Sequence, residues 1–239
     1  MVKFEEFSYA WTYEMASFIR IIVFEEDKSL VDITDYFESI DDDFKKRCLR
    51  PSKITHLHDV IDTAIYSYVE YWERHSDFDE ELEKLLQSYE IPYGPNDDLG
   101  ELVIEKVIPR VTDEVFTILY PDRELLLKLN EIISNHIRAL QQKDHSDLLA
   151  KDGVVSRCTY WPKWLQRAVI FRDNGRCCFC LCDLTGLLVA GAEEHMDHIV
   201  PLHLGGTNDP INIQLLCETC NTSKGATPGK TTKKRHLFW

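Results

Sequence analysis

The stretch that decides the fold is GRCCFCLCDLTGLLVAGAEEHMDHIVPLHLGGTNDPINIQLLCETCNTSK, which runs from residue 175 to residue 224. It opens with a Cys-x-x-Cys pair at Cys177 and Cys180 and closes with a second pair at Cys217 and Cys220. Each pair forms a tight turn that presents two thiolates, and two pairs can surround one tetrahedral Zn²⁺. The spacing therefore allows a zinc site, although two further cysteines in the first cluster leave open which of its thiols are ligands.

Polar residues that a purely structural zinc site does not require lie between and just after the two cysteine pairs. Asp197 and His198 stand side by side in the middle of the stretch, and Asn221 directly follows the last cysteine. Lys224 comes one helical turn after Asn221, on the same face of an expected helix. These residues indicate that the stretch carries chemistry as well as a fold.

As a set, these residues resemble the HNH endonuclease family. The family pattern reads Gly-x-Cys-x-x-Cys, Asp-His-Ile-x-Pro, Gly-Gly, Asn, and Cys-x-x-Cys-Asn-x-x-Lys. The elements that match it are Gly175, Cys177-x-x-Cys180, Asp197-His198-Ile199-x-Pro201, Gly205-Gly206, Asn212 and Cys217-x-x-Cys220-Asn221-x-x-Lys224. Including a lead-in helix near Trp161, the resemblance covers residues 161–225. Residues 1–150 carry no such resemblance.

The resemblance implies two metal centres with different tasks. In the family pattern a glycine precedes the first cysteine by two residues, which selects Cys177 and Cys180, with the second cysteine pair, as ligands of a structural Zn²⁺. A catalytic Mg²⁺ or Mn²⁺ would be held by Asp197 and Asn221, because hard cations prefer oxygen ligands. The family often has histidine at the last of these positions, but the asparagine here still offers an oxygen.

The remaining roles follow from the resemblance and from elementary chemistry. His198 is the expected general base, since imidazole titrates near neutral pH and can take a proton from water. Asn212 is expected to bind backbone groups and to hold the loop that orients His198. Lys224 and His203 are expected to contact substrate, Lys224 through a phosphate. The structural alternative is a capping Asp197 and a buried, hydrogen-bonded His198 without a chemical role.

Charge divides the chain into two unlike halves. Residues 1–150 contain 33 acidic and 16 basic side chains, a net charge of −17, whereas residues 151–239 contain 8 and 11, a net charge of +3. A strongly acidic surface repels phosphates within about 8 Å at physiological salt. Nucleic acid is therefore expected to meet only the C-terminal half. The basic tail Lys230–Arg235 either contacts a DNA backbone or is a solvated end.

The N-terminal half shows helical periodicity in three places. Apolar residues recur at intervals of three and four in residues 4–24, 57–72 and 126–140, which predicts amphipathic helices. Pro121 is expected at the first position of the third helix. Pro109 is expected to break the helical run before it.

The pattern shortens after residue 160. Trp161-Pro162 is expected to start a short helix, residues 187–190 and 195–200 to form two brief strands, and residues 217–224 a final helix. Strand, strand, helix is the order that the resemblance implies. The expected fold class is therefore α+β, mostly α: an N-terminal helical bundle followed by a small zinc-braced ββα-metal (HNH) domain.

Three segments are expected along the chain. Residues 1–145 would form an acidic all-helical domain that regulates the protein or binds a partner. Residues 146–160 would be a linker, because the stretch from residue 141 to residue 153 is polar. Residues 161–239 would form the nuclease domain with its basic C-terminal tail.

Cysteine usage and the N-terminus predict a cytoplasmic protein. Six of the eight cysteines lie between Cys177 and Cys220, a clustering that suits metal better than disulfides. The first residues, MVKFEEFSYAWTYEM, are acidic where a signal peptide is apolar, and apolar runs such as Ile21–Phe24 are far too short to cross a bilayer. A reducing compartment and no membrane partner are expected.

The predicted function is hydrolysis of DNA by a metal-dependent HNH endonuclease, with His198 activating water. One active site per chain would cut one strand, so a double-strand break would need a dimer or two events. By analogy the chain would be a bacterial phage-defence or restriction effector, with a protein partner or self-association through residues 1–150. The alternative is a catalytically inactive, zinc-stabilised module that binds nucleic acid or protein.

Overall fold

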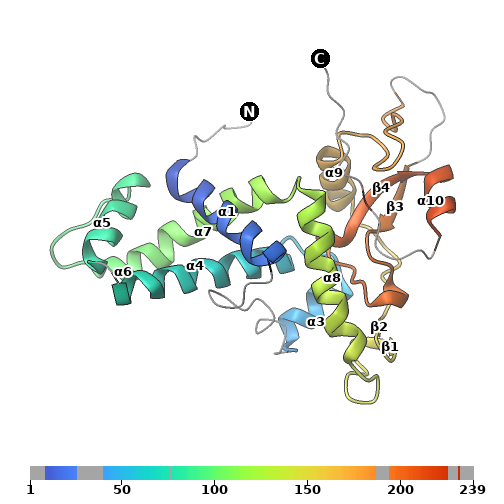
Figure 1. Cartoon of the computed structure of the whole chain (residues 1–239), viewed down its shortest axis with the longest axis horizontal. Coiled ribbons are helices and arrows are strands. Elements are labelled where there is room, and N and C mark those ends of the chain that lie inside the picture. The colour runs from blue at the N-terminus through green and yellow to red at the C-terminus, as the bar shows by residue number, and fades with distance from the viewer. Residues whose placement is uncertain (1–8, 26–39, 76, 187–193, 226–230, 232–239) are drawn as a thin grey trace. The chain divides into compact units, whose positions relative to one another are not determined.

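The computed structural model describes residues 9–25, 40–75, 77–186, 194–225 and 231 (Figure 1). The chain divides into two compact units. The first, here called the helical unit, comprises residues 1–36 and 57–119. The second, here called the mixed unit, comprises residues 37–56 and 120–239.

The helical unit is built from α1 (Tyr9–Glu25), α4 (His56–His75), α5 (Phe78–Ser88), α6 (Leu99–Leu102) and α7 (Ile108–Leu119). The first two cover the described parts of two helices that the sequence predicted. Apolar side chains on the predicted stripes are buried, among them Met15, Ile19, Ile22, Val60, Ile61 and Ile65. The prediction of a helical bundle is confirmed.

Pro109 does not break the helix, contrary to the prediction. A π-helical turn, η1 (Val103–Val107), leads directly into α7, and the Ile108 N–H donates to the Val103 carbonyl. Proline lacks an N–H and crowds the carbonyl four residues earlier. That carbonyl belongs to Glu105, which lies inside the wider π turn, so the chain stays helical through the proline.

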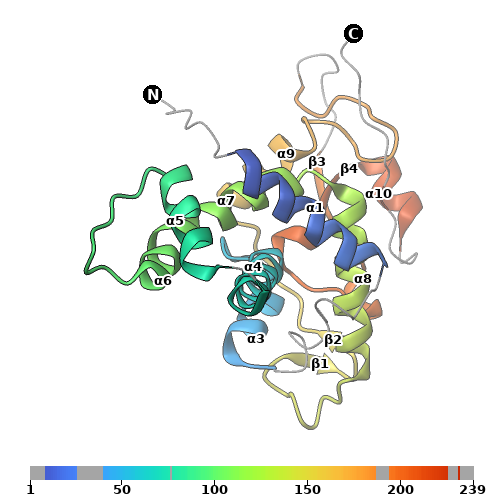
Figure 2. The ribbon, with the colours of Figure 1, turned by 60° about the vertical axis from the view of Figure 1, so that its left-hand side comes forward.

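The mixed unit contains α3 (Asp42–Leu49), α8 (Arg123–Ala139), α9 (Lys163–Arg172) and an antiparallel hairpin of β1 (Leu149–Lys151) and β2 (Val154–Val155). Figures 1 and 2 show the hairpin beside one end of α8. The short helix expected after Trp161-Pro162 is α9, with Pro162 as its N-cap.

An aspartate, not the proline, sets the start of α8. The Asp122 carboxylate caps the helix by accepting from the N–H groups of Glu124 and Leu125 at 3.2 Å each. Pro121 precedes this cap, so its prediction at the first helical position is wrong, because the N-cap preference of aspartate decides where the helix begins. The predicted apolar stripe is confirmed and comprises Leu126, Leu129, Ile133 and Ile137.

A two-stranded antiparallel sheet and a short helix complete the mixed unit. β3 (Glu194–His198) pairs with β4 (Ile213–Cys217) in a register that places Asp197 opposite Gln214. α10 (Glu218–Lys224) follows β4 directly and lies beside the sheet (Figures 1 and 2). The strand–strand–helix order agrees with the predicted α+β fold class.

The two strands are not both the ones expected. The strand predicted at residues 195–200 is β3, whereas residues 187–190 lie outside the described residues. β4 was not predicted. Its residues Ile213 to Leu216 are all fully buried, so the sequence Ile-Gln-Leu-Leu lacks the alternation of a half-exposed strand.

A buried ion pair joins α9 to β4. Arg172 donates to both carboxylate oxygens of Asp173 at 2.9 Å and to the Ile213 carbonyl at 2.6 Å. Asp173 in turn accepts from the Leu215 N–H at 3.0 Å. Because both charges are buried and also hydrogen-bonded to the β4 backbone, the pair fixes the strand against the helix. Leu165, Val169, Cys178 and Leu184 pack in the same core.

The compact units do not divide the chain at residues 145 and 160. α3 and α8 belong to the mixed unit, and the segment expected to be a linker contains the β1–β2 hairpin. The chain therefore leaves the mixed unit after His56 and returns to it at Tyr120. The functional division into an acidic regulatory domain and a nuclease domain remains a prediction.

His56 is a fully buried, neutral histidine in the mixed unit. Its Nε2 lies 3.4 Å from Cys48 Sγ, its ring packs against Phe44, and its backbone N–H donates to Asp209 Oδ2 at 2.9 Å. Burial, with a smaller effect of Arg47, lowers the pKa of His56 to about 3. Because the ring is uncharged near neutral pH, its 4.0 Å approach to Asp209 Oδ2 is not an ion pair under those conditions.

We expect acid to destabilise the mixed unit partly through His56. The unfolded chain binds a proton at the ordinary histidine pKa of 6.5 but the folded chain only near 3, so this contribution to stability is present above pH 6.5 and is lost as the pH falls toward 3. The loss is about 1.4 kcal/mol per pH unit at most. Urea unfolding between pH 7.5 and 4.5 should show a shallower pH slope for His56→Gln than for the wild type.

The control is His203→Gln, which alters an exposed histidine of the same unit. Its unfolding free energy should follow the wild-type slope. Parallel slopes for the wild type and His56→Gln would contradict the assignment of this pH dependence to His56.

Candidate active site and metal centre

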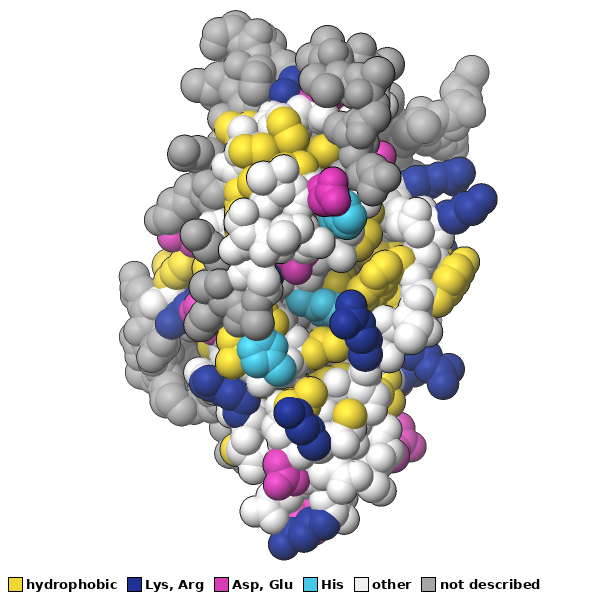
Figure 3. Space-filling model, turned by 90° about the vertical axis from the view of Figure 1, so that its right-hand side faces the viewer, with side chains coloured by type: hydrophobic (Ala, Val, Ile, Leu, Met, Phe, Trp, Pro, Cys, Tyr) yellow, Lys and Arg dark blue, Asp and Glu magenta, His cyan; other side chains and the backbone are white. Residues whose placement is uncertain are grey.

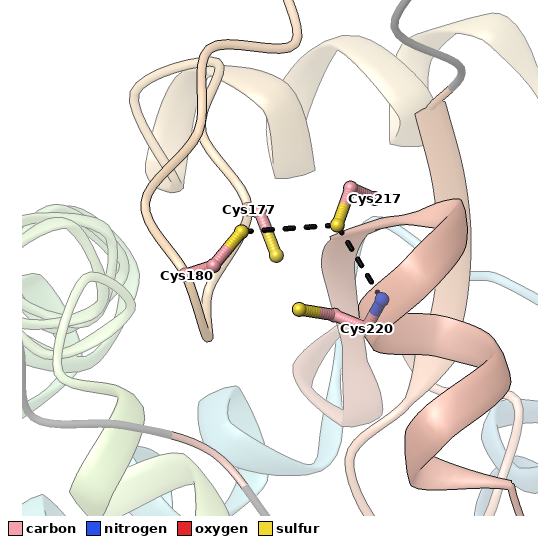
Figure 4. Close-up of side chains that lie close together, drawn as sticks. All are labelled: Cys177, Cys180, Cys217 and Cys220. Atoms are coloured by element: carbon pink, nitrogen blue, oxygen red, sulfur yellow. Dashed lines mark hydrogen bonds between the residues drawn. The ribbon is translucent and has the colours of Figure 1, made fainter.

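Four cysteine thiols converge on one point in the mixed unit (Figure 4). Their Sγ atoms all lie within 4.8 Å of one another, and those of Cys180 and Cys217 are 3.8 Å apart. Zn–S bonds of about 2.3 Å in a tetrahedron place the sulfur atoms about 3.8 Å from each other. The cluster can therefore bind zinc, and its members are the four cysteines selected from the sequence: Cys177, Cys180, Cys217 and Cys220.

Local hydrogen bonds shape each half of the cysteine cluster. Cys217 ends β4 and caps α10, since its Sγ accepts from the Cys220 N–H at 3.4 Å. In the other half the Leu181 N–H donates to the Cys177 carbonyl at 2.9 Å, and Leu181 takes a φ of 64° that closes the turn. The two turns present their thiols toward one another (Figure 4).

Two neighbouring cysteines lie outside the cluster. Cys178 is buried in the apolar core, and burial raises its pKa to about 12. Burial and contact with the Cys180 thiol likewise raise the pKa of Cys182 to about 12. For Cys180 burial acts in the same direction, but hydrogen bonds from Cys182 outweigh it and lower the pKa to about 7. The surroundings therefore favour a thiolate, the form that binds metal, at Cys180.

Asp197, near the end of β3, has one carboxylate oxygen fully engaged. Its Oδ2 accepts from Lys224 Nζ at 2.6 Å and from Gln214 Nε2 at 3.0 Å. The Lys224 ammonium also donates to the His198 carbonyl. Oδ1 of Asp197 has no hydrogen-bond partner among the residues that the structure describes. The carboxylate is thus held in place with one oxygen left available.

Lys224 is hydrogen-bonded within the protein, whereas the sequence predicted that it would contact a phosphate. The side chain is fully buried, and its ammonium donates to Asp197 Oδ2 and to the His198 carbonyl at the end of β3. To reach a phosphate it would have to leave both partners. Phosphate binding by Lys224 therefore remains a prediction, while its observed role is to position Asp197.

Asn221 lies one turn before Lys224 on α10, the helix that packs against β3 and β4. The hydrogen bond from Lys224 to Asp197 joins this helix to β3. The carboxylate oxygen of Asp197 and the amide oxygen of Asn221 are ligands that Mg²⁺ and Mn²⁺ accept. The donor chemistry fits a hard divalent ion.

The His198 ring is held from two sides. Its Nε2 lies 3.3 Å from Asn208 Oδ1, and the Trp161 indole packs edge-on against the ring with the centroids 5.5 Å apart. Burial lowers the pKa of His198 to about 4, against the opposing effects of Asn208 and Asp197. The ring is therefore neutral near pH 7 and can accept a proton.

Asn208 determines which nitrogen of His198 carries the hydrogen. Its fully buried side chain places Nδ2 between 2.9 and 3.2 Å from the backbone carbonyls of Cys48, Leu49 and Ser156. Its Oδ1 also accepts from the Cys158 N–H at 3.2 Å. These contacts fix the orientation of the amide, so Oδ1 can only accept. His198 Nε2 must therefore donate, and Nδ1 keeps a lone pair.

Asn212 closes the loop between β3 and β4. Its Oδ1 accepts from the Val200 N–H at 2.8 Å, and its Nδ2 donates to the carbonyls of Val200 at 3.0 Å and Thr207 at 2.8 Å. Backbone contacts of this kind were expected for Asn212. Gly206 permits the closure, because a Cβ there would lie 1.9 Å from the Val200 carbonyl oxygen.

His203 is exposed in the short turn η2 (Leu202–Leu204). Figure 3 shows one face of the molecule, on which histidine side chains lie beside Lys and Arg side chains. A contact between His203 and substrate remains a prediction. The basic residues of the C-terminal tail lie outside the described residues.

Sequence reasoning missed three residues of the site: Trp161, Asn208 and Gln214. Asn208 stands in an Asn-Asp-Pro sequence, which is typical of an exposed loop, yet it is fully buried. Gln214 did carry a signal, since one amide within the apolar run from Ile213 to Leu216 has to find a partner when buried. Trp161 was recognised only as the start of a helix.

Strand, strand and helix, with a cysteine cluster on one side and an Asp-His pair at the strand end, are features of the ββα-metal class of nuclease domains. Residues 177–227 match the family model described as HNH endonuclease. The chain therefore carries an HNH endonuclease domain, as the resemblance indicated.

One curated relative is the CRISPR-associated endonuclease Cas9 of Corynebacterium diphtheriae. It is 32% identical over 87 residues, which are 36% of this chain and 7% of the relative. The match thus spans a small part of the relative's length. No solved structure matches the chain.

Among the described residues, no helix combines the length and the apolar character needed to cross a lipid bilayer.

We expect one zinc ion per chain, bound through the cysteine cluster. Cys217→Ser should abolish zinc binding and unfold the mixed unit, because structural zinc contributes on the order of 10 kcal/mol to the folding of small sites. Metal analysis of the purified protein and thermal unfolding with and without a chelator would measure both effects. The matched control, Cys182→Ser, should keep the zinc. Full zinc content and an unchanged melting curve in Cys217→Ser would refute the assignment.

Proposed function

We propose that the chain is a metal-dependent endonuclease that hydrolyses phosphodiester bonds in DNA, with His198 as general base. The observation that carries the proposal is the orientation of His198, whose Nε2 faces Asn208 Oδ1 so that Nδ1 keeps its lone pair. The neighbouring Asp197 offers a carboxylate oxygen. The match of residues 177–227 to the HNH endonuclease family supports the same reaction class.

His198 Nδ1 takes a proton from the water whose oxygen bonds to phosphorus. The bond from phosphorus to the oxygen of the leaving strand breaks, and that oxygen takes a proton from solvent. Asn208 then stabilises the resulting imidazolium, because its Oδ1 accepts the hydrogen on Nε2. The fixed ring needs no reorientation before each proton transfer. The loop closed by Asn212 keeps the ring at the end of β3.

Asp197 and Asn221 would hold the divalent ion. Such an ion, when bound, supplies positive charge to the phosphate oxygens as negative charge develops on them. Lys224 and Gln214 both bind Asp197 Oδ2, so they set the direction in which Oδ1 is presented. Asn221 provides its amide oxygen from α10.

The biological setting we propose is a bacterial defence or restriction system. The relative from Corynebacterium is named a CRISPR-associated endonuclease, and this name supports the setting. The support concerns the matched region, which is 36% of this chain. Residues 1–150, with their net charge of −17, would disfavour contact with DNA and bind a protein partner or a second copy of the chain.

One contact favours the alternative of an inactive binding module. The Asp197–Lys224 ion pair at 2.6 Å satisfies part of the carboxylate without any metal. A module that had lost turnover could retain this pair as a structural element. Cleavage assays decide between the two functions.

His198→Ala should abolish cleavage of DNA. Loss of a general base reduces the rate on the order of 100-fold or more, whereas the zinc content should stay at the wild-type level. The measurement is nicking of supercoiled plasmid in Mg²⁺ or Mn²⁺, with EDTA as the metal-free reference. His195→Ala, which removes another histidine of β3, is the matched control.

Two results would count against the endonuclease. Equal nicking by the wild type and His198→Ala would remove His198 from the reaction. No cleavage by the wild type in either metal, together with retained nucleic-acid binding, would leave the binding module as the function.

Asn208→Ala should slow cleavage on the order of 10- to 100-fold, the usual effect of removing a residue that orients a reactive group. Without Oδ1, the hydrogen of His198 is no longer confined to Nε2. The ¹⁵N chemical shifts of the His198 ring should therefore change from one tautomer toward a mixture. This signature separates positioning from mere loss of stability.

Asn130→Ala provides the control for Asn208→Ala. Asn130 is also a buried asparagine of the mixed unit, and its side chain donates to the carbonyls of Leu126 and Ile211 rather than contacting the His198 ring. It should lower the melting temperature without altering the His198 spectrum. If both variants leave the tautomer as in the wild type, Asn208 does not select it.

A further inference from the structure

The segment that precedes and forms α9 is basic in an acidic chain. Residues 153–172 contain four basic side chains and no aspartate or glutamate, although the whole chain has 41 acidic residues among 239. Arg172 is buried against Asp173, whereas the other three, Arg157, Lys163 and Arg167, are exposed. The exposed charges have no acidic residue between them along the segment.

Exposed aromatic side chains flank two of these charges, Lys163 and Arg167. Tyr160 is 69% exposed and Phe171 is 86% exposed. Lys163, Arg167 and Phe171 recur every four residues on α9, so they follow one face of the helix over about 12 Å. Tyr160, Lys163, Arg167 and Phe171 are here called the aromatic–basic stripe.

The segment is tied to His198 by short contacts. Trp161, next to Tyr160, packs against the His198 ring. The stripe therefore begins beside the group that would take the proton from water.

Backbone hydrogen bonds hold the start of the stripe rigid. Asn208 accepts from the Cys158 N–H and donates to the Ser156 carbonyl. The Cys158 thiol donates to the Tyr160 carbonyl at 3.1 Å, and Gln166 Nε2 donates to the Trp161 carbonyl at 2.8 Å. Because the backbone is fixed, little conformational entropy is lost when the exposed Tyr160 ring binds a ligand.

We propose that the aromatic–basic stripe binds a single-stranded stretch of the nucleic-acid substrate, with an unpaired base stacked on Tyr160 and phosphates contacted by Lys163 and Arg167. Exposed aromatic side chains on either side of basic ones offer stacking faces for bases and positive charge for phosphates. In a duplex the bases stack on one another, so an aromatic side chain gains a base only where the strand is unpaired. The inference rests on the proposed function and names its substrate: DNA with an unpaired segment next to the scissile phosphate.

The test is DNA binding by the full, zinc-loaded chain carrying His198→Ala, which prevents cleavage. Fluorescence anisotropy compares a short labelled single strand of mixed sequence with its blunt duplex. Adding Tyr160→Leu should weaken single-strand binding about fivefold or more, the usual effect of losing one stacked base, and should leave duplex binding nearly unchanged. Arg167→Gln should weaken binding to both and reduce the salt slope by about one.

Tyr71→Leu is the matched control, since Tyr71 is an exposed tyrosine of the helical unit at 55%. It should not change binding to either DNA. No binding of the single strand by the parent protein, or an equal effect of Tyr160→Leu on both DNAs, would overturn the proposal.

Because binding is measured without turnover, this result is separate from the cleavage assay. A wild type that cuts plasmid, with unchanged single-strand binding in Tyr160→Leu, would disprove the stripe and leave the endonuclease standing. A wild type that cuts nothing, with lost single-strand binding in Tyr160→Leu, would support the stripe in a binding module.

Discussion

The site depends on the closure of a buried loop between β3 and β4. Thr207 to Asn212 are all fully buried or nearly so, and a buried loop is stable only if its backbone and side-chain polar groups find partners. Two asparagines provide them: Asn212 joins the two sides of the loop, and Asn208 joins the loop to α3 and to the segment before α9. The geometry of His198 follows from these bonds, since the ring contacts one of the same amides.

At the end of β3, the negative charge of Asp197 is balanced by a positive side chain of the protein itself. Asp197 carries its charge next to the Lys224 ammonium, and Gln214 adds a neutral donor to the same oxygen. The carboxylate is therefore neutralised in part before any ion arrives, which limits the repulsion of an approaching phosphate. The same pairing keeps the buried lysine satisfied.

Much of the fold and of the site could be predicted from the sequence, because helical periodicity and cysteine spacing are local signals. They gave α1, α4, α8 and the zinc-compatible cluster. What could not be predicted depends on burial. β4 lacks alternation because both its faces are covered, and Asn208 is typical of a loop but lies in the interior. Pro109 follows a π-helical turn, and no residue pattern in the sequence predicts such a turn. The partner of Lys224 is likewise set by tertiary packing rather than by its place after Asn221.

The mixed unit is formed by two separate segments of the chain, which limits how the protein can be truncated or fused. α3 comes before the helical unit in sequence, and its end is bonded to Asn208 beside His198. A fragment that starts at residue 151 would lack α3, and with it the Cys48 and Leu49 carbonyls that help to orient Asn208. The region that matches the HNH family model, residues 177–227, is thus hydrogen-bonded to residues that precede the helical unit in the sequence. A minimal version that keeps these contacts would join residues 37–56 to residues 120–239, and any exchange of the helical unit would have to respect both junctions.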